Sequence, residues 1–216
     1  WSTLTSTKGE LDELWYRLYC AVSRCNRALV SLQQNGESTL GAEVTKQREA
    51  EVRFLRAHFY FKLLTMYRQI PWIDEKVYED KTTESTSNTQ FTYEELWQKV
   101  IADFQTAYDV LPAKQKDGGR VNKIAAAGYL AKCYLTIAWG DGYEATDGVD
   151  HINKEYMQKV IDYTDVVKNS DYGYMADFGD IFLPDYKNNK ESVFAVQTSD
   201  YSEDHTTFGR ANWSNM

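Results

Sequence analysis

One stretch of apolar residues in the first third of the chain limits the possible folds more than any other feature. Residues 42–69 follow a helical pattern that stops ahead of Pro71, and the second half of this pattern is apolar on nearly every side. Its apolar residues are Phe54, Leu55, Ala57, Phe59, Tyr60, Phe61, Leu63, Leu64 and Met66. A helix without a polar face has to be surrounded by other elements. We therefore expect residues 42–69 to form the centre of a helical core.

Two capping-box sequences mark the starts of other helices. Thr7 to Glu10 and Thr92 to Glu95 both have the form T-x-x-E, in which a hydroxyl and a carboxylate satisfy amides of the first helical turn. Apolar residues then recur at helical spacing on one face, which predicts amphipathic helices. The first should end near Gly36 and the second ahead of Pro112.

Two more helices are predicted in the second half of the chain. Residues 122–139 are rich in alanine, and these small side chains allow a neighbouring helix to approach closely. A fifth helix is predicted at 154–167, with a short helical piece near 174–182 as its partner. By contrast, residues 72–90 combine charged residues with a Thr and Ser cluster, which indicates a long surface loop.

The predicted helices fall into pairs at about 7–70, 92–139 and 154–183, within one helical domain over residues 1–216. Tetratricopeptide-type arrays bury the faces of such antiparallel pairs by stacking them, although the strict repeat consensus is absent here. Residues 191–198 have the composition of a strand. The expected fold class is all-α: tetratricopeptide-like helix pairs with long loops and one or two short strands near the C-terminal end.

Charge and aromatic content narrow the class of ligand. Lysine and arginine number 24 against 32 acidic residues, and the net charge of -8 disfavours a phosphate backbone, so nucleic acid is not expected as a partner. No apolar run approaches the ~18 residues of a transmembrane helix. Tyrosine (16), tryptophan (6) and phenylalanine (9) make up 14% of the chain. Tyrosine and tryptophan in excess suit sugar rings, because the ring face stacks while the OH or NH donates.

No catalytic residue set stands out from the sequence. The three histidines are not spaced as metal ligands on a helix face, and neither a nucleophile elbow nor a phosphate-binding glycine loop is present. A glycoside hydrolase needs two carboxylates across a cleft, and Asp141 with Glu144 or Asp185 with Glu191 are the pairs to consider. Because closeness in sequence does not set their separation in space, we interpret the chain as a binding protein without catalytic residues.

An acidic loop at Asp141–Asp150 is the one candidate cation site. It places four acids among glycines, and such carboxylates are ligands for Ca²⁺, although the spacing does not fit an EF-hand. Charge-rich loops usually stay hydrated, so a solvated loop is the favoured interpretation. No cofactor or metal is therefore expected, with Ca²⁺ as the alternative.

Five segments, in order, resemble the SusD/RagB family. The sharpest is EAEVRFLRAHFYFKLLTMYRQIPWI (Glu49–Ile73), which is similar to the hallmark helix of that family and to the Tyr/Phe-Gly-x-Val-Pro turn that ends it. The other four are Leu14–Leu29, with Trp15, Tyr19 and Asn26 at the matching places, then Phe91–Lys114, Gly119–Gly140 and Ile181–Gln197. Arg68 and Gln69 stand where the family turn has Gly, so we expect the helix to continue slightly further toward Pro71.

The resemblance implies an all-helical, non-enzymatic lipoprotein on the surface of the bacterial outer membrane. Such a protein serves nutrient uptake: it captures a glycan or a peptide and delivers it to a SusC-like TonB-dependent transporter. Its membrane attachment would be a lipid on a cysteine that precedes Trp1 and is absent from this chain. Members of the family extend well beyond this length, so we expect the helical domain to be truncated at its C-terminal end.

The resemblance also implies a shallow aromatic platform that stacks on the ligand, and we look for it among aromatic residues on loops. Trp15 and Trp97 lie on core stripes and are set aside. The candidate ligand-binding residues are Trp1, Trp72, Tyr78, Trp139, Tyr143, Tyr201 and Trp213. Packing over an adjacent helix is the alternative for each of them.

Two other functions are kept as alternatives. A helical-repeat scaffold would bind a protein or peptide on its concave face, and protein partners without saccharide binding would favour it. An all-helical glycoside hydrolase would turn over a glycan and would lose that activity when one carboxylate is changed.

Overall fold

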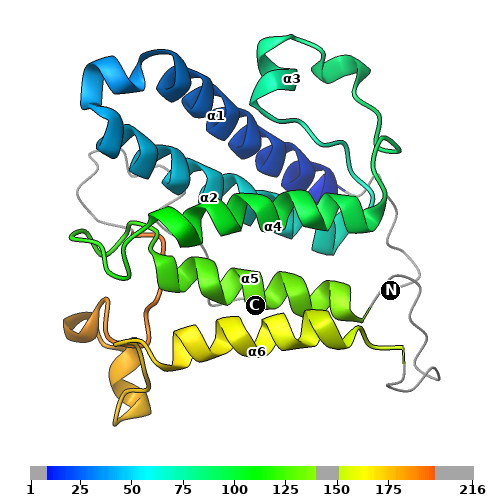
Figure 1. Cartoon of the computed structure of the whole chain (residues 1–216). Coiled ribbons are helices and arrows are strands. Elements are labelled where there is room, and N and C mark those ends of the chain that lie inside the picture. Colours follow the sequence, from blue (N-terminus) through cyan, green and yellow to red (C-terminus); the bar gives the residue numbers. More distant parts are fainter. Residues whose placement is uncertain (1–8, 140–150, 198–216) are drawn as a thin grey trace.

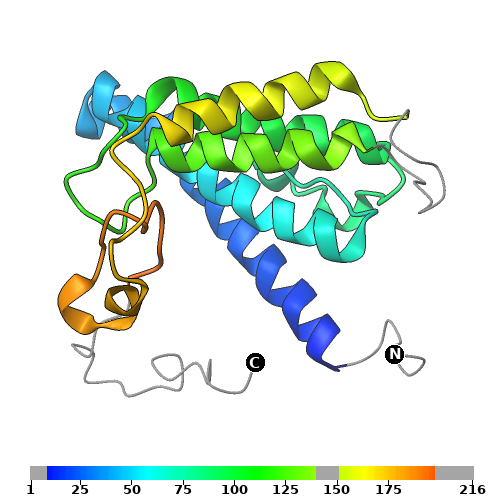
Figure 2. The same cartoon turned by 90° about the horizontal axis from the view of Figure 1, so that it is seen from below.

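The computed structural model describes residues 9–139 and 151–197 (Figure 1). Its long helices are α1 (Gly9–Leu40), α2 (Ala42–Tyr67), α4 (Tyr93–Val110), α5 (Lys123–Ala138) and α6 (Lys154–Lys168). The short helical elements are α3 (Glu75–Glu79), η1 (Thr83–Ser85), η2 (Phe178–Phe182) and η3 (Pro184–Tyr186). Each long helix packs on the next in sequence and runs antiparallel to it (Figures 1 and 2). The all-α, tetratricopeptide-like fold class is confirmed.

The hairpin between α1 and α2 is tighter than the sequence indicated. We predicted that the first helix ends near Gly36, but α1 continues to Leu40 and the break falls at Gly41, where φ is 83°. Gly36 is buried, and a Cβ there would lie 2.6 Å from Cγ2 of Thr45 on α2. Gly36 therefore permits the close approach of two helices, and Gly41 supplies the left-handed turn between them.

The end of α2 corrects a second boundary. The helix stops at Tyr67 instead of continuing to Gln69, because Arg68 adopts φ 63° in the left-handed region that favours glycine. The N–H of Arg68 donates to the carbonyl of Leu64 at 3.0 Å, as a glycine C-cap would do. The chain can then turn inward, so that Ile70 is 1% exposed.

The core lies between α2, α4 and α5, as the apolar pattern of α2 predicted. Phe54 of α2 is completely buried, and its ring centroid lies 5.2 Å from Phe104 of α4 and 5.5 Å from Tyr129 of α5. The alanines at 125–127 of α5 are also buried and keep this helix close to its neighbours. Met66, at the end of the same apolar stretch, is exposed instead.

The start of α4 confirms the second capping box. Oγ1 of Thr92 accepts from the N–H of Glu95 at 3.2 Å, and Oε2 of Glu95 accepts from the N–H of Thr92 at 2.7 Å. The loop predicted at 72–90 contains the short helix α3, which is capped by the carboxylate of Asp74. The first capping box begins outside the described residues.

The segment after α6 differs from the prediction. Residues 191–197 form no strand. The part of the chain that the structure describes holds no strand for them to pair with, and the backbone bonds to a side chain instead. Nδ2 of Asn122 donates to the carbonyl of Val193 at 3.0 Å, and the Phe194 ring packs 5.3 Å from Phe54. The apolar composition at 191–198 therefore reflects packing against α5 and α2. In the same region, the expected pairing of α6 with the short piece that follows it is corrected. α6 packs on α5, and the short piece is the 3₁₀-helix η2, which packs on η3.

Among the described residues, none of the helices has the length and hydropathy needed to span a bilayer.

Candidate functional site

Trp72 was a candidate for ligand stacking on sequence grounds, but the structure places it in the core. It is 4% exposed, and its ring stacks on Tyr60 with 4.1 Å between centroids and 22° between planes. The Tyr60 hydroxyl donates to the carbonyl of Ile73 and accepts from its N–H, both at 2.8 Å, which holds this turn against α2. Because the left-handed end of α2 directs the chain inward, Trp72 packs as a core residue. The prediction that Trp72 is a ligand contact is therefore corrected.

A buried network of ion pairs holds the turn after α2 in place. Arg56 is 2% exposed, and its guanidinium donates to both carboxylate oxygens of Asp103 at 2.7 and 2.9 Å, to Asn26 at 2.9 Å and to Glu75. Arg53 donates to the same two carboxylates at 3.0 and 3.1 Å. Burial alone would raise the pKa of Glu75, but the Arg56 and Arg53 charges outweigh it and lower this pKa to about 2. The network is internally satisfied, so its role is structural.

The structure does not bring the remaining predicted aromatics together. Tyr78 is half-buried in α3, whereas Trp139 is half-buried at the C-cap of α5, with its ring 5.7 Å from that of His151. Outside the described residues lie Trp1, Tyr143, Tyr201, Trp213 and the Asp141–Asp150 loop. Within the described ranges, no group of three or more His, Cys, Asp or Glu is placed to hold a metal ion.

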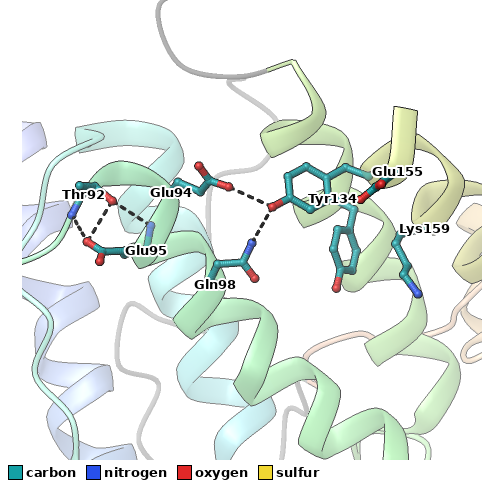
Figure 3. Close-up of a pocket in the computed structure, with 8 residues that line it drawn as sticks. Thr92, Glu94, Glu95, Gln98, Tyr134, Glu155 and Lys159 are labelled. Atoms are coloured by element: carbon teal, nitrogen blue, oxygen red, sulfur yellow. Dashed lines mark hydrogen bonds between the residues drawn. The ribbon is translucent and has the colours of Figure 1, made fainter. Parts of the chain in front are cut away.

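A pocket of about 590 Å³ lies where the first turns of α4 face α5 and the first turns of α6 (Figure 3). We refer to it as the α4–α6 pocket. Its lining residues are Thr92, Glu94, Glu95, Gln98, Tyr134, Glu155, Tyr156 and Lys159. Two aromatic rings therefore lie beside carboxylates, an amide and an ammonium group.

Tyr156 joins two sides of the α4–α6 pocket. Asn153 caps α6 by accepting from the N–H of Tyr156 at 3.1 Å, which places this tyrosine in the first turn. Its hydroxyl donates to Oε1 of Glu94 at 2.9 Å and accepts from Nε2 of Gln98 at 3.3 Å, and Figure 3 draws both bonds. The bond to Glu94 and partial burial raise the pKa of Tyr156, so the hydroxyl stays protonated at neutral pH.

Tyr134 supplies the second ring from α5. Its centroid lies 5.8 Å from Tyr156 in a tilted arrangement and 5.9 Å from Tyr163, on which it stacks. Glu155 and Lys159 are exposed on α6, one helical turn apart. The pocket thus has fixed rings next to charged groups that are free to meet solvent or ligand.

The chemistry of the α4–α6 pocket suits recognition of a hydroxyl-rich ligand. Carboxylates accept hydrogen bonds from hydroxyl groups, an ammonium donates, and an amide does both, while tyrosine rings present apolar faces. Glu95 is held by the capping box, where bonds from the Thr92 backbone and side chain lower the pKa of its carboxyl. A general acid for glycoside hydrolysis requires the opposite shift. Among the carboxylates that the sequence offered for glycoside hydrolysis, Glu191 accepts from the N–H of Met175 at 2.6 Å and so orders the backbone.

Sequence reasoning missed this pocket because it sought aromatic residues on loops. Tyr134 and Tyr156 lie on helices, where the apolar pattern assigns tyrosines to packing. A partial signal was present on α4, since Glu94 and Gln98 are four residues apart and share an exposed helix face. Their meeting with α6 depends on tertiary structure.

Comparison with known proteins gives the relationship of this chain. The profile of a SusD-like family described as "starch-binding associating with outer membrane" matches residues 1–135. A SusD-like protein of Bacteroides ovatus is 27% identical over 195 residues, which cover 90% of this chain and 34% of that protein. This chain therefore spans about a third of the length of that curated relative.

Solved structures share the fold described above. A SusD superfamily protein from Parabacteroides distasonis superimposes with a TM-score of 0.76 at 26% identity, over 92% of this chain and 40% of that one. A crystal structure with a xylogluco-oligosaccharide gives a TM-score of 0.75 at 26% identity, over 93% of this chain and 38% of that one. Because the family profile covers more than half of its residues, and the helical array has the same architecture as these structures, this chain belongs to the SusD-like family.

Proposed function

We propose that the protein is a non-catalytic glycan-binding protein of the outer-membrane surface. It captures an oligosaccharide or polysaccharide and delivers it to a TonB-dependent transporter. The observation that carries the binding proposal is the α4–α6 pocket, in which Tyr134 and Tyr156 lie beside hydrogen-bonding groups. Membership of the SusD-like family and the related structure with a xylogluco-oligosaccharide support the same ligand class.

The size and chemistry of the pocket fit a short stretch of glycan. A volume of about 590 Å³ lies within the range of roughly 300–1,000 Å³ that is typical of small-ligand sites. A net hydrogen bond to a charged group contributes roughly 1.5–3 kcal/mol, and several modest contacts along one chain together give useful affinity. We therefore propose this pocket as one contact surface for the ligand.

Trp139 and Tyr78 stay proposed ligand contacts from the sequence. Trp139 follows α5 at the end of the array where α4 and α6 begin, which is also the end that holds the α4–α6 pocket (Figure 1). A glycan that extends beyond the pocket would pass this residue. Trp1, Tyr143 and Trp213 are likewise predictions, as are the domain limits, the lipid anchor and the transporter partner.

Titration calorimetry with a xyloglucan oligosaccharide and a maltooligosaccharide tests the proposal. We expect Tyr134→Ala and Gln98→Ala each to weaken binding about tenfold, which corresponds to about 1.4 kcal/mol. Tyr16→Ala is the matched control, because Tyr16 is 69% exposed on α1 and does not line the pocket. Thermal melting of each variant verifies that the half-buried Tyr134 can be removed without unfolding.

Three outcomes would contradict the proposal. Unchanged affinity in both pocket variants would remove the site assignment, and binding of peptides without any saccharide would favour the scaffold alternative. Turnover of a glycan that is lost on changing one carboxylate would instead show a glycoside hydrolase.

A further inference from the structure

The first turns of two helices meet at the α4–α6 pocket, and both carry acidic residues. Glu94 and Glu95 lie in the first turn of α4, and Glu155 lies in the first turn of α6. All three line the pocket and are exposed. Lys159 of α6 is the one cationic side chain among the lining residues (Figure 3). The pocket therefore presents three carboxylates and one ammonium group to a ligand that enters it.

The helix ends at this pocket offer little to attract an acidic ligand. The N–H groups and the dipole of a helix N-terminus favour a negative charge, which is why many anion sites lie at such ends. Here Oγ1 of Thr92 accepts from the N–H of Glu95, and Oδ1 of Asn153 accepts from the N–H of Tyr156. The first-turn carboxylates complement the two dipoles in the same way. The chain itself thus supplies the oxygens and the negative charge that an anionic ligand would otherwise provide.

The hydrogen bonds in the pocket keep its carboxylates as acceptors. Bonds from the backbone and side chain of Thr92 lower the pKa of Glu95, and Glu94 accepts from the hydroxyl of Tyr156. Hydroxyl groups of a neutral sugar donate to ionised carboxylates of this kind. A carboxylate or sulfate group on a sugar has no proton to donate and carries a charge of the same sign, so its approach is opposed.

We propose that the α4–α6 pocket selects glycans by charge: it admits neutral sugars and excludes those that carry carboxylate or sulfate groups, with Glu155 as a specificity-determining residue. This inference rests on the proposed glycan contact at the same pocket and adds the class of glycan. Glu94 holds Tyr156, and Glu95 completes the capping box of α4. Glu155 is therefore the carboxylate that can be changed without disturbing these contacts.

Titration calorimetry with matched neutral and acidic probes tests the selection. The probes are a xyloglucan oligosaccharide and a maltooligosaccharide, each compared with a form whose primary alcohols have been oxidised to carboxylates. At low salt we expect a neutral oligosaccharide that binds to do so at least about tenfold more tightly than its oxidised form. The ratio of the two affinities should shrink as salt is added, because salt screens the repulsion between exposed charges.

Charge variants at Glu155 separate repulsion from the loss of sugar hydroxyls, which oxidation also removes. We expect Glu155→Lys to lower the ratio of neutral to acidic affinity by at least about threefold, with Glu155→Gln between this variant and the unchanged protein. Glu37→Lys on α1 is the matched control, because it changes the net charge equally and Glu37 is exposed and does not line the pocket. Melting temperatures verify that each variant is folded.

Equal affinity for a neutral oligosaccharide and its oxidised form would overturn the inference, as would the same ratio in Glu155→Lys and the unchanged protein. An equal change of the ratio in Glu37→Lys would assign the selection to the charge of the whole chain instead of the pocket. In these three cases the neutral glycan still binds, so the proposed function stands. If neither neutral oligosaccharide binds, the proposed function fails and this inference falls with it.

Discussion

The turn after α2 and the first turns of α6 use similar residue types in opposite ways. Near the turn, Trp72 and Arg56 are buried. The Trp72 ring stacks on Tyr60, and the Arg56 guanidinium pairs with carboxylates of α3 and α4 and donates to Asn26 of α1. On α6, Tyr156 and Lys159 are partly or fully open and line a pocket. The difference teaches that position in a loop or a helix does not decide whether an aromatic or charged side chain can meet a ligand. What decides it is how far the neighbouring helices cover the side chain, because Tyr156 also has hydrogen-bond partners on α4 and yet stays partly exposed.

The largest loss of stability is expected when Asp103 is removed from the buried ion network. Asp103→Ala leaves the guanidinium of Arg56 with less than its full set of partners, and we expect the free energy of unfolding to fall by about 3–5 kcal/mol. Denaturant unfolding measures this loss. Asp109→Ala is the matched control on the same helix, because Asp109 is exposed and its carboxylate accepts from Nε2 of Gln105 at 2.9 Å. Similar losses in the two variants would show that burial of the ion network is not what matters.

Trp72 sharpens the contrast between packing and binding. We expect Trp72→Ala to lower the free energy of unfolding by about 3 kcal/mol, because it removes a ring that stacks on Tyr60. Glycan affinity, measured well below the melting temperature, should stay unchanged. A selective loss of glycan affinity with little loss of stability would return Trp72 to the list of ligand contacts.

Acidification should lower the free energy of unfolding through the buried ion network around Arg56. The pKa of Glu75 is about 2 in the folded protein against an ordinary value of 4.5, so this carboxylate stabilises the fold above pH about 4.5. That contribution is lost as the pH falls from about 4.5 toward 2. After allowance for solvent screening, we expect a loss of about 2 kcal/mol, measured by urea unfolding at pH 7 and near pH 2. The Glu75→Gln variant should show a flatter dependence on pH, and an equal slope would contradict this assignment.

The smallest effect is expected at the open side of α6. Ile161 is 51% exposed, so we expect Ile161→Ala to change the free energy of unfolding by less than about 0.5 kcal/mol. Leu29→Ala on α1 provides the contrast, because Leu29 is completely buried and its truncation should cost about 2–5 kcal/mol. Thermal melting of both variants compares the two regions directly. A large loss at Ile161 would mean that α6 is covered in solution.

The positions of most helices could be predicted because their signals are local. Thr92 and Glu95 form their capping box within four residues, and the apolar run around Phe54 requires a central helix wherever the rest of the chain goes. Helix ends were harder to predict. Gly36 looked like a stop signal, yet the contact with Thr45 uses this glycine for helix packing.

The candidate site shows the limit of such reasoning. Tyr156 and Glu94 are 62 residues apart, and neither is unusual within its own helix. Trp72 follows a proline in a polar stretch, and only its stacking on Tyr60 reveals a core residue. Strand-like composition at 191–197 likewise reflected packing, because an isolated segment has no partner strand for its backbone.

By itself, the amino-acid sequence determined an all-helical chain with α2 at its centre, the approximate limits of most helices and the resemblance to a family of glycan-binding proteins. The tertiary structure alone decided which aromatic rings are buried and which line a pocket beside carboxylates. The physical reason is the range of the interactions involved. Helix signals act between residues about four positions apart, whereas burial and pocket formation depend on contacts between segments that are distant in sequence.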